Sequence, residues 1–222
     1  MELSPELLIS AYAQGLFPMA QSKESPDVEW ICPRLRGQIS IKDMHIPKRL
    51  AKSVRQMKLT GAPYEIKINA AFSQVIENCA KCTAQREATW INQEIISAFT
   101  KLHELGLAHS VECWQRDKLA GGLYGLALGG AFFGESMFSL QRDASKVALV
   151  HLVARLHYAQ FDILDIQFIN DHLLQFGAYE IVHQKYMKRL EFALQKRCNF
   201  ERSDVNEKTL IEHYFRIRNS AP

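Results

Sequence analysis

Two short stretches of the sequence place polar side chains where an apolar strand is expected. Glu135 stands in AFFGESMFS, residues 131–139, among aromatic and other apolar residues. A carboxylate in such surroundings is costly to bury unless a cation or a hydrogen-bond donor meets it. In ILDIQF, Asp165 and Gln167 are two residues apart, so they project from the same face of a strand. These three side chains are candidates for catalysis; the structural alternative is a polar network that ties strands together.

Other catalytic and metal-binding signatures are missing from the sequence. GGLYG and GGAFFG lack the spacing and the lysine of a P-loop, and neither a GxGxxG opening a helix nor a GxSxG occurs. The eight histidines show no metal-ligand spacing. Cys79 and Cys82 form a CxxC, but no second pair could complete a zinc site. We therefore expect no metal and no cofactor.

The composition indicates a globular protein of ordinary character. A chain of 222 residues that is 47% hydrophobic can build one sizeable core, with or without a smaller domain attached. Its net charge of +3 permits an anionic partner without requiring one. The N-terminus lacks the pattern of a signal peptide, the five cysteines are scattered, and no apolar run is long enough to span a membrane. We expect a cytoplasmic monomer without membrane contact.

The breakers and apolar spacing predict an α+β fold in two parts. Ser4 and Pro5 are typical of a helix start, and one or two short strands follow in VEWICPRLRGQISI. We assign residues 1–42 to a small N-terminal domain. Residues 43–222 are expected to form an acetyltransferase-like (GNAT-type) domain with a central mixed sheet flanked by helices, because a run of strands is followed by an amphipathic helix and a further strand. The polar tail after Phe200 is expected to be loosely held.

A basic helix is predicted for IPKRLAKSVRQMK, residues 46–58. Leu50, Val54 and Met57 recur at i, i+4 and i+7, so they face inward and the basic residues face outward. This is either a solvated face or a ridge that binds phosphates. The basic residues are Lys48, Arg49, Lys52, Arg55 and Lys58.

The sequence resembles the leucyl/phenylalanyl-tRNA–protein transferase family, in a subgroup with a short N-terminus. The resemblance covers residues 6 to about 190, in family order and spacing. The stretches that carry it are LLISAYAQGLFPM, TWINQEI, LHELGLAHSVECW, LAGGLYGLALGGAFFGESMFS, ASKVALVHL, LDIQF and DHLLQFGAYEI.

This resemblance implies an enzyme that moves leucine or phenylalanine from aminoacyl-tRNA to the N-terminal amine of acceptor proteins, with methionine as a further candidate. The acceptors usually begin with Arg or Lys, and the new N-terminus marks them for degradation. The family uses neither ATP nor a cofactor. Two other functions are compatible with the residues alone: an acyl-CoA–dependent N-acetyltransferase and a non-catalytic tRNA-binding module.

The resemblance also assigns roles to the polar strand residues. Glu135 would meet either the α-ammonium or the basic side chain of the acceptor. Asp165 would orient and polarise Gln167, and Gln167 would hold the attacking amine, since an amide is a poor base.

For substrate binding, the resemblance points to apolar and aromatic residues. Met137, Leu149 and Leu164 would line a pocket for the donor's side chain, with plain core packing as the alternative. Trp30 and Trp90 would stack on the terminal adenosine. On the basic helix, Lys48, Arg49, Lys52 and Arg55 would hold the tRNA backbone without reading bases.

The chain departs from the common family pattern near the expected donor site. It has Met19 where many members have a Trp, and Glu29-Trp30 where many have a Trp pair. Donor and acceptor preferences are therefore less closely specified than the reaction.

Overall fold

The computed structural model describes residues 3–55, 64–82, 88–201 and 205–220. The N-terminal segment forms a helix and a two-stranded antiparallel sheet, α1 (Pro5–Ala13), β1 (Phe17–Ala20) and β2 (Val28–Ile31). The Ser4 hydroxyl accepts a hydrogen bond from Leu7 N, as expected for an N-cap. Gly15 adopts a φ of +77°, which lets the chain turn out of the helix.

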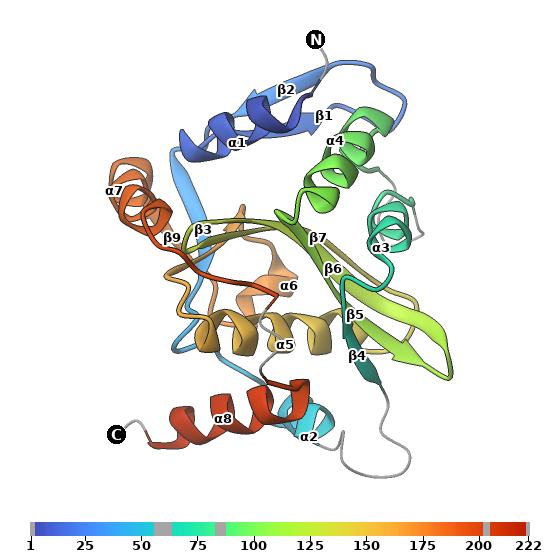
Figure 1. Cartoon of the computed structure of the whole chain (residues 1–222), viewed down its shortest axis with the longest axis vertical. Coiled ribbons are helices and arrows are strands. Elements are labelled where there is room, and N and C mark those ends of the chain that lie inside the picture. The colour runs from blue at the N-terminus through green and yellow to red at the C-terminus, as the bar shows by residue number, and fades with distance from the viewer. Residues whose placement is uncertain (1–2, 56–63, 83–87, 202–204, 221–222) are drawn as a thin grey trace.

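A mixed sheet of seven strands forms the centre of the molecule (Figure 1). Every pair of neighbours is antiparallel except β7 and β8, which are parallel and are connected through helix α5 (Ala144–Tyr158). In spatial order the strands are β4 (Glu65–Ile68), β5 (Ala108–Gln115), β6 (Lys118–Leu128), β7 (Ala131–Ser139), β8 (Ile163–Gln167), β3 (Leu35–Ile39) and β9 (Tyr179–Val182).

Strand β3 takes part in this large sheet although it lies early in the chain. It pairs with β8 on one side and β9 on the other, and its residues from Arg36 to Ile39 are buried. A strand buried in this way needs hydrogen-bonding partners on both edges, which the short N-terminal sheet does not offer. The boundary expected at residue 42 stays a prediction, and β3 connects the segment before it to the central sheet.

Helices cover both faces of the sheet (Figure 1). One hydrophobic cluster lies under α2 (Lys48–Arg55), α5 and α8 (Glu207–Ser220). The other lies under α1, α3 (Phe72–Cys79), α4 (Gln93–Glu104) and α7 (His183–Leu194). A short helix, α6 (Asp171–Leu174), follows β8. Among the residues that the structure describes, no helix has the length and apolar character that a membrane crossing requires.

The tail after Phe200 differs from its expectation. Instead of being loosely held, it contains helix α8, which packs against α5 and α2. The expectation was wrong because four apolar residues recur on one face within an otherwise polar segment. These buried residues are Leu210, Ile211, Tyr214 and Phe215.

Candidate active site

The candidate active site lies where strands β7 and β8 separate. The two strands pair from Ala131 with Ile163 to Phe133 with Asp165, after which β7 continues beside β6 alone. Opposite β6, the register shifts so that Glu135 becomes an extra residue in β7, between Gly134 and Ser136. Such a bulge bends a strand and redirects its side chains. Glu135 therefore lies just beyond the last pair of β7 and β8, and this place where the two strands stop pairing is called the opening.

Gln167 reaches the same opening from the end of β8. Its φ is +55°, and the carbonyl of Ile166 accepts a hydrogen bond from Phe168 N at 2.7 Å, so Gln167 is the centre of a tight three-residue turn. A left-handed conformation is costly for a residue with a side chain and occurs where the surroundings enforce it. The turn brings Gln167 Nε2 to 3.3 Å from Glu135 Oε1.

Asp165 is held by a buried network below this turn. Arg36 Nε donates to both carboxylate oxygens, at 3.0 and 2.9 Å, and the Tyr186 hydroxyl donates to Oδ2 at 2.5 Å. The side chains of Arg36 and Asp165 are both 0% exposed. Asp165 Oδ1 also accepts the backbone N–H of Gln167 at 2.9 Å. The contact that we find between Asp165 and Gln167 is thus with the backbone, which orients the turn rather than polarising the amide side chain.

Arg36 and Tyr186 were missed by the sequence reasoning. Burial opposes the charge of Arg36, but the neighbouring Asp165 outweighs it, so the pKa of Arg36 is raised. Burial and then Asp165 raise the pKa of Tyr186, which keeps its hydroxyl proton. The available signal was an arginine inside the strand LRGQI, together with a buried aspartate that required a cation.

The N-terminal segment reaches the site through Arg36. Its Nη1 donates to the carbonyl of Gly15 at 2.8 Å, and its guanidinium lies 4.7 Å from the ring centres of both Phe17 and Tyr186. A Cβ on Gly15 would lie 2.7 Å from Met187 Sδ, so glycine allows this close approach of α1 to α7.

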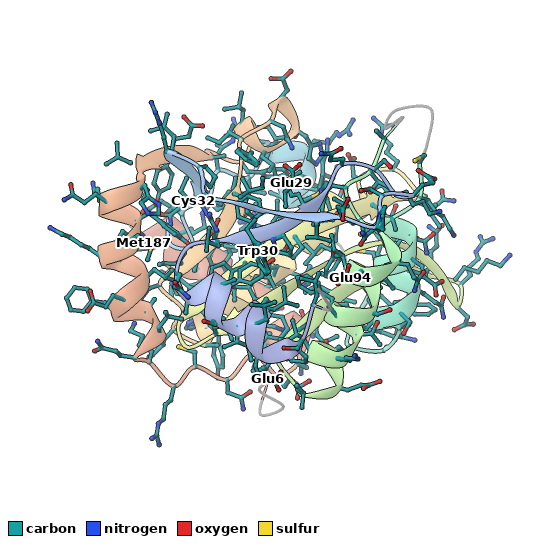
Figure 2. All side chains as sticks on the ribbon, turned by 90° about the horizontal axis from the view of Figure 1, so that it is seen from above. Glu6, Glu29, Trp30, Cys32, Glu94 and Met187 are labelled. Atoms are coloured by element: carbon teal, nitrogen blue, oxygen red, sulfur yellow. The ribbon has the colours of Figure 1, made fainter. Side chains whose placement is uncertain are left out.

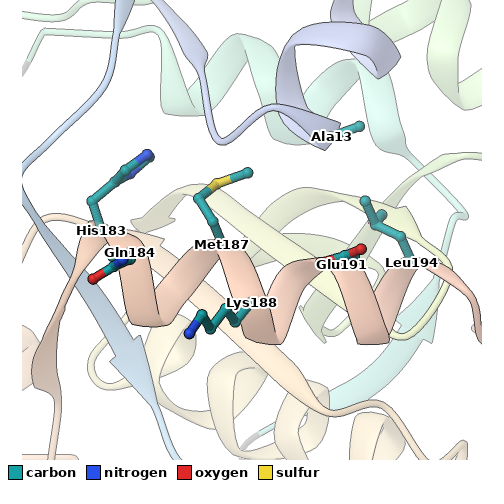
Figure 3. Close-up of a pocket in the computed structure, with 7 residues that line it drawn as sticks. All are labelled: Ala13, His183, Gln184, Met187, Lys188, Glu191 and Leu194. Carbon is teal, nitrogen blue, oxygen red and sulfur yellow. The ribbon is translucent and has the colours of Figure 1, made fainter.

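A groove of about 640 Å³ opens between the end of α1 and α7 (Figure 3). Ala13 lines it from α1, whereas the other lining residues belong to α7, among them His183, Met187 and Leu194. In Figure 3, Met187 points from α7 toward α1. The groove therefore lies on the surface next to the Gly15 contact that connects α1 to the buried network.

Glu135 accepts a hydrogen bond from an amide in place of a cation, and a buried hydroxyl lies nearby. Tyr12, from α1, has its hydroxyl buried beside the carboxyl group, and Gln167 donates from the other side. Burial raises the pKa of Glu135 to about 8; Tyr12 lowers it, the charge of Asp165 raises it and Arg36 lowers it. As a residue, Glu135 is only partly buried in β7, so it lies close to the surface although its carboxyl group is enclosed by Tyr12 and Gln167.

The apolar residues expected to bind the donor side chain belong to the cluster under α5. Leu149 and Leu164 are buried, and Met137 is half-buried against them. Leu164 Cδ1 lies 3.8 Å from the position that a Cβ on Gly134 would occupy. Leu164 thus borders the opening between the strands, while Leu149 packs within the core beneath it.

Trp30 and Trp90 lie on the other side of the sheet from Leu149 and Leu164. Both rings are partly exposed and pack against the cluster that contains Tyr12. The carbonyl of Trp90 accepts a hydrogen bond from Ala20 N at 3.1 Å, and Trp30 belongs to β2. Figure 2, viewed from above, shows Trp30 in this N-terminal layer. The structure thus separates the two tryptophans from the apolar residues under α5.

The basic helix α2 exposes the four residues proposed to contact tRNA. Arg49 Nη2 donates to Asp143 Oδ2 at 2.8 Å, and the guanidinium of Arg55 lies 4.3 Å from the ring centre of Phe215. Met57 and Lys58, which the sequence reasoning placed in the same helix, lie outside the described residues. In the described part of the chain, no group of three or more His, Cys, Asp or Glu residues could hold a metal.

Comparisons with known proteins identify the family. The family model "Leucyl/phenylalanyl-tRNA protein transferase" matches residues 38–191, and the model of the family's N-terminal domain matches residues 1–34.

Curated relatives match over most of their length. The leucyl/phenylalanyl-tRNA–protein transferase of Phenylobacterium zucineum is 53% identical over 193 residues, covering 87% of this chain and 85% of the relative. That of Paramagnetospirillum magneticum is 50% identical over 201 residues, covering 90% and 94%. These matches confirm the predicted family and the α+β, acetyltransferase-like fold. The chain therefore belongs to the leucyl/phenylalanyl-tRNA–protein transferase family, the tRNA-dependent aminoacyltransferases of the N-end rule pathway.

Proposed function

We propose that Glu135, Asp165 and Gln167 form the reaction centre at which this enzyme transfers leucine or phenylalanine to the N-terminal amine of an acceptor protein. The observation that carries the proposal is the contact of Gln167 Nε2 with Glu135 Oε1 beside the opening between β7 and β8. A carboxyl and an amide side chain on neighbouring strands offer two different groups to one amine. The donor ester is already activated, so positioning the amine supplies much of the rate.

In this proposal Glu135 receives the acceptor's α-ammonium group and accepts its proton. The raised pKa of Glu135, about 8, favours this role, because an α-amino group has a pKa of about 7.7–8.0 and proton transfer works best between matched groups. The freed amine attacks the aminoacyl carbon, so a C–N bond forms while the ester C–O bond breaks. Protonated Glu135 gives its proton to the leaving ribose oxygen and then takes the second proton that the nitrogen loses as it becomes an amide. That last proton passes to solvent, which returns Glu135 to its starting state.

Gln167 aligns the amine, and the network around Asp165 keeps Gln167 in place. A neutral amide is a weak base but presents both a donor and an acceptor in a fixed plane. Asp165, Arg36 and Tyr186 support the strained turn from below. Arg36 also joins that turn to Gly15 in the N-terminal segment. Arg36 and Tyr186 are positioning residues in this scheme.

The remaining residues are assigned by substrate chemistry. We assign Met137, Leu149 and Leu164 to the apolar side chain of the donor, supported by the place of Leu164 beside the opening. Trp30 and Trp90 are candidates for stacking on the terminal adenosine, because both present partly exposed indole rings on the face of the sheet that carries Tyr12. The aminoacyl end would then pass between the two faces where β7 and β8 stop pairing. Lys48, Arg49, Lys52 and Arg55 are assigned to the tRNA backbone, and all four are exposed.

The preferred acceptors in this proposal begin with Arg or Lys. This preference is what the family implies; at the reaction centre, ionised Glu135 favours a cationic acceptor before it takes the proton of the amine, and Asp165 is already neutralised by Arg36. All five cysteines are free thiols, which fits the reducing cytoplasm that we expect for this enzyme. A monomeric state stays a prediction.

A transfer assay tests the proposed function. Purified enzyme is mixed, without ATP or CoA, with tRNA charged with labelled Leu, Phe or Met and with acceptors that differ only in a first residue of Arg, Lys, Asp, Glu or Ala. Label on the Arg and Lys acceptors supports the proposal. Label confined to Asp or Glu acceptors would overturn the acceptor assignment while keeping the reaction.

Variants of the reaction centre test the residues. Gln167→Ala should lose transfer and keep tRNA binding, whereas Gln195→Ala, an exposed glutamine at the end of α7, should keep both. Full transfer activity in Gln167→Ala and in Glu135→Ala would show that the reaction centre lies elsewhere.

A further inference from the structure

The start of helix α5 carries a cluster of cations around one carboxylate. Asp143 lies 2.8 Å from Arg49 Nη2, 3.4 Å from Lys146 Nζ and 3.8 Å from Arg142 Nε. Arg49 belongs to α2, whereas the other two belong to the turn before α5 and to α5 itself. One acid thus gathers cations from two elements that are far apart in the sequence. Burial opposes the negative charge of Asp143, but Arg49 and Lys146 outweigh it, so the pKa of Asp143 is lowered.

Positive charge remains in excess on this surface. Asp143 neutralises one charge, while Arg49, Arg142 and Lys146 bring three. Lys48 and Lys52, on the exposed side of α2, bring two further positive charges. The side chains of Arg142, Arg49 and Lys146 are 78%, 64% and 27% exposed, so Arg142 and Arg49 are open to a ligand and Lys146 reaches solvent with part of its side chain. Such a surface suits a chain of phosphates better than a single anion.

The turn that carries Arg142 is held in place by hydrogen bonds. The Tyr64 hydroxyl donates to the carbonyl of Arg142 at 2.6 Å. Ser139 Oγ accepts Ser145 N at 2.9 Å and donates to Ser145 Oγ at 2.8 Å, which fixes the end of β7 against the start of α5. The cations therefore start from a fixed backbone, which lowers the entropy lost when a ligand binds.

This cluster follows the end of β7, the strand that carries Glu135. Along β7, Glu135 and Ser139 are separated by roughly 13 Å, at 3.3 Å per residue. A ligand that spans both places must be extended, as the single-stranded end of a tRNA is.

We propose that Arg142 and Lys146 continue the phosphate-binding surface of α2 toward the reaction centre and hold the backbone of the aminoacylated end of the donor tRNA. Asp143 contacts Arg49 of α2 and Lys146 of α5, and so holds these cations of the two helices close to each other. The inference rests on the proposed role of α2 in binding tRNA. The inference adds the start of α5 to the phosphate-binding surface of α2, and α5 follows the strand that carries Glu135.

The test compares two donors that differ in their phosphates. Arg142→Ala, Lys146→Ala and the double variant are assayed with leucyl-tRNA and with a leucyl ester of adenosine, which has no phosphate. Lys188→Ala, an exposed lysine on α7, is the charge-matched control. We expect KM for leucyl-tRNA to rise about fivefold per removed cation, because an exposed charge contact is worth on the order of 1 kcal/mol. Kinetics with the adenosine ester should not change.

Binding of uncharged tRNA, measured by fluorescence anisotropy at several salt concentrations, gives an independent readout. Each single variant should lower the salt slope by about one, as expected for the loss of one phosphate contact. Unchanged KM and slope would overturn the inference, as would an equal loss with the adenosine ester or in Lys188→Ala. If the wild type binds tRNA but transfers nothing, the proposed function is overturned; slopes lowered by about one in Arg142→Ala and Lys146→Ala would still support this inference, and unchanged slopes would overturn it as well.

Discussion

Gln167 Nε2 lies 3.3 Å from Glu135 Oε1, beside the place where strands β7 and β8 stop pairing. The contact joins an extra residue in one strand to a left-handed residue at the end of the next. Two local irregularities thus create the pair, because regular pairing of the strands would have directed both side chains elsewhere.

The rate of transfer should depend on the protonation of Glu135. Its pKa of about 8 means that the carboxylate, the form able to accept a proton, increases as the pH rises from 6 to 8. We expect the single-turnover rate of the wild type to rise over this range and then level off. Glu135→Gln should be slower by about a hundredfold, the usual contribution of a general base.

Rapid-quench measurements between pH 6 and 9 test this prediction. Glu180→Gln, at an exposed site on β9, serves as the control and should keep the wild-type profile. A Glu135→Gln enzyme with the same rate and the same pH profile as the wild type would show that Glu135 takes no part in proton transfer.

The stability of the fold should also depend on the protonation of Glu135, but it should decrease over the pH range in which the transfer rate rises. Folding raises the pKa of Glu135 from 4.5 to about 8, so between these values the folded protein binds more protons than the unfolded chain. The contribution of Glu135 to the free energy of unfolding is therefore present below pH 4.5 and decreases as the pH rises toward 8.

Urea denaturation at pH 5, 6.5, 8 and 9 measures this effect. Glu135→Gln cannot lose the proton, so its stability relative to the wild type should improve as the pH rises. A difference between the two proteins that is constant over the whole range would show that the pKa of Glu135 is not raised on folding.

The left-handed backbone of Gln167 predicts a conflict between stability and activity. Glycine adopts a φ of +55° without strain, whereas a residue with a Cβ pays of order 1 kcal/mol. Gln167→Gly should therefore be about 1 kcal/mol more stable than Gln167→Ala, since both lack the contact with Glu135. Both variants should lose transfer to the same extent.

Thermal unfolding and the transfer assay together separate the two effects. Equal stability of the glycine and alanine variants would contradict the strained turn. Retained transfer in the glycine variant would contradict the role of the Gln167 amide.

The polar residues of the site could be recognised in the sequence because their surroundings are apolar. Glu135 and Asp165 both stand in strands otherwise made of large apolar residues, and each required a partner. The partners could not be read in the same way. Tyr12 belongs to the apolar stripe of α1, where an aromatic residue is ordinary, and nothing in that stripe indicates a carboxyl group beside it.

The order of the strands in the sheet is the second feature that the sequence could not predict. Arg36 meets Asp165 only because β3 inserts between β8 and β9, and this pairing joins residues 129 positions apart. Local patterns predict that a strand exists, but its neighbours depend on tertiary packing. Helix α8 could have been predicted from the sequence, because four apolar residues recur there at helical spacing. The polar residues around them led to the wrong expectation of a loosely held tail. The four are Leu210, Ile211, Tyr214 and Phe215.

The buried pair of Arg36 and Asp165 should be the most sensitive point of the fold. Arg36→Met leaves the carboxylate of Asp165 buried without its cation, which costs about 3–5 kcal/mol. The same change frees Gly15 from its contact with Arg36 and releases the turn at Gln167. We therefore expect loss of stability and loss of transfer together. Arg49→Ala, which breaks an exposed pair with Asp143, should cost less than about 1 kcal/mol.

A second change distinguishes the charge from the contacts. In Arg36→Met combined with Asp165→Asn no buried charge is left unpaired, so much of the lost stability should return. Transfer should stay low in the double variant, because Arg36 no longer holds Gly15 and the amide only partly replaces the carboxylate that accepts Gln167 N. Full recovery of both stability and transfer would mean that Arg36 serves only to neutralise Asp165. No recovery of stability would mean that the contacts of Arg36 with Gly15, Phe17 and Tyr186 outweigh its charge.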